Sequence, residues 1–128
     1  MRAQLAERGP RAVADLMLPK LVSADAAPAT RDLLRRMIES LDPRAIDAAI
    51  GAMLDRPDST PDLARINIPT LVVVGEHDML TPVSDAEAMQ RAIPRSRLVV
   101  IPGAGHLANL EQPEAFSRAL ADFLGSAL

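Results

Sequence analysis

The sequence predicts an α/β fold, in which a helical segment over residues 1–65 precedes a strand–helix–strand–helix unit over residues 66–128. Up to about Arg56, apolar residues recur at the three- and four-residue spacing of amphipathic helices. Beyond residue 66, two short runs of β-branched residues alternate with helical patterns. That alternation is typical of parallel strands covered by helices. A chain of 128 residues is long enough to bury a core.

The N-terminal half contains three helical patterns. Apolar residues from Ala12 to Met17 repeat at helical spacing, and we expect Pro19 to end that helix because proline lacks the N–H that continues it. A second amphipathic pattern covers about residues 30–41. Asp42 followed by Pro43 predicts an N-cap and first turn for a third helix, since an aspartate cap and a proline at the first helical position are both favoured.

The C-terminal half contains the two predicted strands. Thr70–Val74 and Leu98–Ile101 are continuous apolar runs of the kind that strands buried on both faces show. Between them, Thr81-Pro82 predicts the cap of a helix that ends near Ile93. The last helix is expected to start near Pro113 and to end at Gly125 as a C-cap. We interpret Glu111 and Glu114 as charges near its N-terminus, where the helix dipole favours them.

The loops that follow the two strands hold the candidate functional residues. Asp78 lies in the loop Gly75–Pro82, and His106 ends the loop Pro102–His106. Sites in open parallel sheets form outside the carboxyl ends of the strands. If the strands are neighbours, about 5 Å apart, the two side chains can meet. A carboxylate that accepts the imidazole N–H fixes the tautomer and leaves the other ring nitrogen as a base.

Simpler interpretations of these residues remain open. Asp78 can serve only as a turn residue, and His106 can be a loop histidine without a role. Glu76 is an alternative acid. His77 beside Asp78 suggests a metal ligand, but one adjacent pair is a weak ligand set, so we expect His77 to be solvent-exposed and no metal to be bound.

The loop motifs resemble those of the α/β-hydrolase family. Ile68–Asp78 with Thr81-Pro82 resembles the acid-bearing strand and loop of these enzymes, and Pro102–His106 followed by Asn109–Phe116 resembles their histidine loop and last helix. The family keeps the chain order serine, acid, histidine. The resemblance therefore implies that Asp78 and His106 are the acid and the base of a catalytic triad. It also implies that residues 1–65 belong to a helical cap over the active site.

The sequence departs from the family at the nucleophile. The family places its serine in Gly-x-Ser-x-Gly, and none of the seven serines here has that context. We therefore expect a fragment, a split subunit or a truncated frame without free-standing activity. The resemblance implies that the complete enzyme hydrolyses small apolar esters or lactones, as an esterase or lactonase does, without a cofactor or metal.

Composition excludes other classes of function. The net charge is −3 and basic residues are scattered, so nucleic-acid binding is not expected. No apolar run approaches the roughly 20 residues of a membrane span, and residues 1–10 contain no apolar h-region, so we expect no signal peptide. With no address in the sequence, we expect a cytoplasmic protein.

A second hypothesis treats the chain as a non-catalytic α/β module. Two parallel strands leave open edges that can pair with other chains. This hypothesis predicts a homo-oligomer or a complex with an N-terminal partner chain that supplies the missing strands. An upstream frame encoding Gly-x-Ser-x-Gly would favour the enzyme instead.

Overall fold

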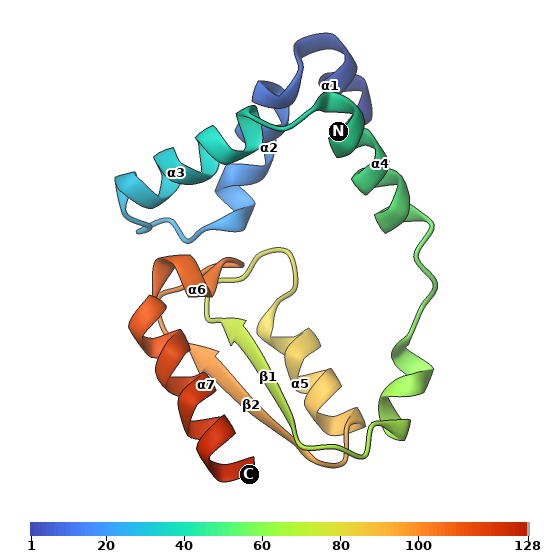
Figure 1. The fold of residues 1–128 in the computed structure, drawn as a ribbon, viewed down its shortest axis with the longest axis vertical. Coiled ribbons are helices and arrows are strands. Elements are labelled where there is room, and N and C mark those ends of the chain that lie inside the picture. The colour runs from blue at the N-terminus through green and yellow to red at the C-terminus, as the bar shows by residue number, and fades with distance from the viewer. Residues whose placement is uncertain (128) are drawn as a thin grey trace. The chain divides into compact units, whose positions relative to one another are not determined.

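The computed structural model describes residues 1–127, which form two compact units (Figure 1). One unit comprises Met1–Pro19 and Ala27–Asp58. The other comprises Lys20–Ala26 and the chain from Ser59 onward. The compact units therefore meet between Asp58 and Ser59, and the second unit also includes the residues Lys20–Ala26. A cap role for the helical unit stays a prediction.

Helices build the first unit around a small apolar core. Leu5, Val13, Ile46 and Ile50 form this core, with Met17 and Ile38 packed against it. Gly9, with φ of 69°, separates the first two helices because its left-handed backbone does not continue either one. The helices that contribute to the unit are α1 (Arg2–Arg8), α2 (Pro10–Leu21), α3 (Pro28–Glu39) and α4 (Pro43–Leu54).

Two sequence signals in these helices had different outcomes. The predicted cap of α4 is confirmed, since the Asp42 carboxylate accepts the Arg44 backbone N–H at 2.8 Å. The prediction that Pro19 ends its helix is wrong, because α2 continues to Leu21. Proline removes one N–H···O bond, and so close to the helix end that loss is confined to the last turn.

The second unit contains the predicted parallel strand pair. β1 (Thr70–Gly75) pairs with β2 (Ser96–Ile101) in parallel, from Thr70 opposite Ser96 to Gly75 opposite Ile101. The other elements are η1 (Thr60–Arg65), α5 (Val83–Ala92), α6 (Ala108–Glu111) and α7 (Pro113–Ala127). This confirms the predicted fold, a partial α/β sheet with helices. Across residues 1–127, no helix combines the length and the apolar character that crossing a membrane requires.

Helices cover both faces of this sheet, with α5 on one side and α7 on the other (Figure 1). Val72 and Val74 of β1 pack with Ala86 of α5. Ile101 of β2 packs on the opposite side, in a cluster with residues of α6 and α7. Coverage of β2 is incomplete, because Val100 is 37% exposed. The prediction that both strands are buried on both faces is therefore wrong for β2.

Two predicted helix ends are also wrong. α5 begins at Val83 without a side-chain cap, because the Thr81 hydroxyl is bonded to Asp78 instead. α7 runs through Gly125 to Ala127, so Gly125 is a helical residue and not a cap. The short helix α6 has no counterpart in the sequence prediction.

Candidate active site

Backbone hydrogen bonds bring the two strand-end loops together. The Glu76 N–H donates to the Ile101 carbonyl at 3.0 Å, and the His77 N–H donates to the Ala104 carbonyl at 2.8 Å. These bonds extend the strand pairing beyond Gly75, the last residue of β1. The loop after β1 and the loop after β2 are therefore held side by side at the carboxyl edge of the sheet.

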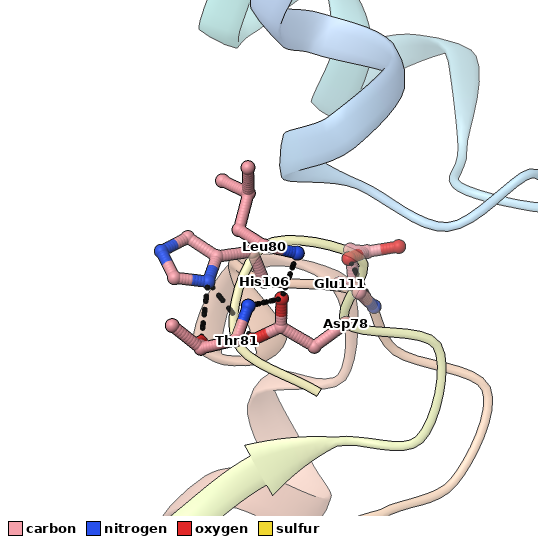
Figure 2. Close-up of polar contacts among 6 residues, drawn as sticks. Asp78, Leu80, Thr81, His106 and Glu111 are labelled. Atoms are coloured by element: carbon pink, nitrogen blue, oxygen red, sulfur yellow. Dashed lines mark hydrogen bonds and ion pairs between the residues drawn. The ribbon is translucent and has the colours of Figure 1, made fainter. Parts of the chain in front are cut away.

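Asp78 and His106 meet at this edge. The His106 Nδ1 lies 2.9 Å from the Asp78 Oδ2, a hydrogen-bond distance (Figure 2). The proximity predicted from the strand ends is confirmed. The bond joins the carboxylate of the first loop to the imidazole of the second, the arrangement that a catalytic acid–base pair requires.

Donors satisfy both oxygens of the Asp78 carboxylate. Oδ1 accepts the backbone N–H groups of Leu80 at 2.9 Å and Thr81 at 3.0 Å. Oδ2 accepts the Thr81 hydroxyl at 2.9 Å in addition to His106. Burial favours the neutral carboxyl and works to raise its pKa, but these hydrogen bonds stabilise the anion and hold the pKa of Asp78 below its ordinary value. Asp78 is thus an ionised, fixed acceptor.

The imidazole of His106 is open on its other side. Its side chain is 34% exposed, whereas that of Asp78 is 4% exposed. Figure 2 shows the second ring nitrogen pointing away from Asp78. With Nδ1–H donated to the carboxylate, Nε2 carries the lone pair and can accept a proton from a reacting group. Thr81 Oγ1 also lies 3.3 Å from the same Nδ1.

Close backbone packing fixes the histidine loop. Gly103 adopts φ of 68°, the left-handed region that favours glycine. Its N–H donates to the Glu76 Oε2 at 2.9 Å, so Glu76 holds the loop while Asp78 takes the imidazole. A Cβ at Gly75 would overlap the carbonyl oxygens of Ala104 and Gly105. Only glycine allows the end of β1 to lie this close to the loop.

His77 contributes no metal site in the described structure. Its Nε2 lies 3.8 Å from Glu76 Oε2, and both side chains are about half exposed. Across residues 1–127 no three His, Cys, Asp or Glu side chains group closely enough to hold a metal ion. The side chain of His77 therefore faces solvent beside the site.

Sequence reasoning missed the role of Glu111 in this region. Its carboxylate accepts the Gly105 N–H at 2.7 Å and the Ser23 N–H at 2.8 Å. Interpreting Glu111 as a charge near the helix α7 terminus overlooked both bonds. One partner lies 88 positions away in the sequence, so no local pattern could have revealed it.

Comparisons with known proteins agree with this architecture. A family model described as the alpha/beta hydrolase family matches residues 1–119. A solved thermophilic esterase from Thermogutta terrifontis is 39% identical, with a TM-score of 0.93 over 98% of this chain and 47% of its own. The solved enol-lactonase from Burkholderia xenovorans LB400 is 28% identical, with a TM-score of 0.88 over 97% of this chain and 48% of its own.

A curated relative gives a similar result. The 3-oxoadipate enol-lactonase 1 of Acinetobacter baylyi is 41% identical over 73 residues, which is 57% of this chain and 27% of the relative. The chain thus spans about half the length of the solved structures that it matches. Its match to this curated relative covers a smaller share of that protein.

Proposed function

This chain belongs to the alpha/beta hydrolase family, and from that premise we propose that Asp78 and His106 are the acid and base of a serine-type triad. In the complete enzyme this triad hydrolyses carboxylic esters or lactones. The observation that carries the proposal is the 2.9 Å bond between the imidazole Nδ1 and a buried carboxylate at the carboxyl edge of parallel strands.

The geometry supports a specific division of labour. His106 Nε2 takes the proton of the attacking serine hydroxyl and later gives it to the leaving alcohol. In the second step a water attacks the acyl-enzyme, and His106 Nε2 takes the proton of that water and returns it to the serine oxygen. Asp78 keeps Nδ1 protonated and stabilises the imidazolium that forms. We propose that the serine elbow and the oxyanion donors come from polypeptide outside these 128 residues, since no serine here lies in Gly-x-Ser-x-Gly.

The substrate class follows the relatives. Similar proteins are named as an esterase and as enol-lactonases. Esters and lactones both present an acyl carbonyl with an oxygen leaving group. We propose a small apolar ester or lactone for this protein. We also propose that the helical segment over residues 1–65 acts as a cap in the complete enzyme.

A chimaera tests this function directly. The part of the Thermogutta esterase that matches this chain, 47% of its length, is replaced by this chain, and hydrolysis of short p-nitrophenyl esters is measured. We expect turnover that a serine-reactive phosphonate abolishes. His106→Ala should lower kcat by about 10³-fold or more, because loss of the base removes the proton transfer. The 128-residue chain alone should show no turnover above background.

His77→Ala is the matched control. It removes the neighbouring imidazole, which is about half exposed and lies 3.8 Å from Glu76 Oε2, and it keeps the backbone N–H that donates to the Ala104 carbonyl. Its rate should equal that of the unmodified chimaera. A chimaera that is folded by circular dichroism, yet keeps its rate in His106→Ala, would contradict the proposed triad.

A second candidate function is that of a non-catalytic module that self-associates or complements a partner chain. It is favoured by apolar side chains that α7 leaves exposed, Leu120 at 43% and Leu124 at 49%. Exposed apolar side chains of this kind indicate a surface that is buried against another chain. The catalytic pair and the exposed face are compatible if the partner chain carries the serine.

A further inference from the structure

We propose that Glu111 is a positioning residue for His106, clamping the histidine loop to the segment Leu21–Ser23. The contacts of this clamp are the two bonds that the Glu111 carboxylate accepts, from Gly105 and from Ser23. All of these residues belong to one compact unit. The proposal rests on the proposed function only in treating His106 as the base.

The clamp lies next to the imidazole in the chain. Gly105 directly precedes His106, and its N–H donates to Glu111 Oε1 at 2.7 Å. On the other side, the Leu107 N–H donates to the Leu21 carbonyl at 3.0 Å. The backbone is therefore tied at both neighbours of His106. With both neighbours fixed, the direction of the Cα–Cβ bond of His106 is set, and so is the reach of its ring to Asp78.

Backbone packing shows that the contact is close as well as polar. A Cβ at Gly105 would lie 2.7 Å from the Ser23 nitrogen and from the Val22 carbonyl carbon, and 3.0 Å from Glu111 Oε1. Gly105 and Ser23 are both buried. Their N–H groups need acceptors there, because an unpaired buried N–H is costly. Glu111 supplies one oxygen to each.

A carboxylate is suited to this task in a way that an amide is not. Glutamate offers two acceptor oxygens, so each of the two N–H groups receives its own acceptor. Glutamine offers one oxygen, and its NH₂ group would face the second N–H donor. Glu111→Gln therefore preserves shape and volume while breaking one of the two bonds. It separates the hydrogen bonding of the clamp from side-chain packing.

The clamp also connects two parts of the chain. The segment Lys20–Ala26 comprises the last two residues of helix α2 and most of its connection to α3. Glu111 joins this connection to the histidine loop.

The test is NMR of the 128-residue chain labelled with ¹⁵N at histidine and backbone nitrogens. Only two histidines are present, so His77 serves as an internal reference for the ring signals of His106. Three readouts are compared among wild type, Glu111→Gln, Glu111→Ala and the control Glu114→Gln. They are the His106 ring ¹⁵N shifts, amide exchange at Gly105 and Ser23, and amide exchange within β1.

We expect Glu111→Gln to speed exchange at Gly105 or Ser23 about tenfold, as the loss of one ordinary hydrogen bond does. The His106 ring shifts should move toward those of the exposed His77. Exchange within β1 should stay unchanged, and Glu114→Gln should match wild type because Glu114 is exposed. Glu111→Ala should give the larger effect.

Three results would overturn the clamp. One is an unmoved His106 ring in Glu111→Gln. Another is equal acceleration within β1, which would make Glu111 a general stability residue. Failure of both Glu111 variants to fold has the same meaning. An Asp78→Asn variant separates this from the proposed function. If the His106 ring ¹⁵N shifts do not change in Asp78→Asn, the catalytic pair itself is contradicted. If they change in Asp78→Asn but not in Glu111→Gln, the clamp alone is contradicted.

Discussion

At the scale of single residues, the Asp78 carboxylate predicts a pH dependence of stability. Its hydrogen bonds hold the pKa below the ordinary 3.8, so the anion stabilises the folded state. A depressed folded-state pKa gives stability that is complete above the unfolded pKa and is lost as the pH falls through the folded one. The free energy of unfolding of wild type should exceed that of Asp78→Asn by about 2 kcal/mol near neutral pH. This difference should shrink below about pH 4. Urea unfolding from pH 7 to pH 3 measures it.

Another aspartate supplies the control for this experiment. Asp62 is exposed on η1, and its carboxylate accepts a long bond of 3.4 Å from the exposed Arg65 guanidinium. Asp62→Asn should change stability little at any pH, since exposed pairs contribute little. A wild-type advantage over Asp78→Asn that stays constant down to pH 3 would mean that the carboxylate is not the stabilising group.

Thr81 should tune the same carboxylate. Its hydroxyl donates to Asp78 Oδ2 at 2.9 Å, and this bond lowers the pKa of Asp78. Thr81→Val removes the hydroxyl while keeping the backbone N–H that Oδ1 accepts. The pKa of Asp78 should therefore move up toward its ordinary value, with a loss of about 1 kcal/mol in stability at neutral pH. Carbon NMR of the Asp78 carboxyl follows the titration, and Thr30→Val is the control. An unchanged midpoint in Thr81→Val would show that the hydroxyl is not a donor in solution.

These residues mark what a sequence can reveal at this scale. Asp78 and His106 follow recognisable strands, so their meeting was predictable from the rule for parallel sheets. Thr81 was assigned to a helix cap because threonine before proline fits that pattern equally well. Glu111 was missed because one of its partners is distant in the chain. Side-chain hydrogen bonds between segments distant in the sequence become visible only in the folded structure.

At the scale of elements, Gly75 determines how closely β1 approaches the histidine loop. A methyl group there would overlap the backbone oxygens of Ala104 and Gly105, which cannot swing away as a side chain can. Gly75→Ala should cost at least about 2 kcal/mol of stability, as overpacking of a tight site does. It should also lengthen the bond between Asp78 and His106. Thermal unfolding and the His106 ring ¹⁵N shifts test the two effects.

Gly125→Ala is the matched control. Gly125 lies within α7, and nothing stands within 4 Å of a Cβ built there. Alanine favours a helix over glycine by up to about 1 kcal/mol, so this variant should be as stable as wild type or slightly more stable. If Gly75→Ala behaves like Gly125→Ala, the close approach of β1 to the loop is not a constraint in solution.

The elements themselves followed from the sequence more closely than their ends did. Continuous β-branched runs gave β1 and β2, and an aspartate before proline gave the start of α4. The helix ends depended on local hydrogen bonds that the periodicity of apolar residues does not reveal. α2 continued past Pro19 because one lost bond near a terminus is tolerated.

At the scale of the whole molecule, the sheet of the second unit predicts association. Within residues 1–127 it has two strands, so β1 and β2 each have one edge without a strand partner. Open edges pair readily with other chains, and so small a sheet is marginal alone. Strand β2 and helix α7 also carry exposed apolar side chains: Val100, Leu120 and Leu124.

We therefore expect the 128-residue chain to self-associate, or to bind a dye specific for exposed apolar surface, at low micromolar concentration. Size-exclusion chromatography with light scattering measures the mass. Replacing Leu120 and Leu124 with glutamate should reduce association, because burying these charges against another chain is unfavourable. Leu54→Glu is the control, since Leu54 is 72% exposed on α4 of the other unit. A monomer that unfolds cooperatively and binds no dye would contradict the prediction, because the strand edges and the α7 surface would then be tolerated in water.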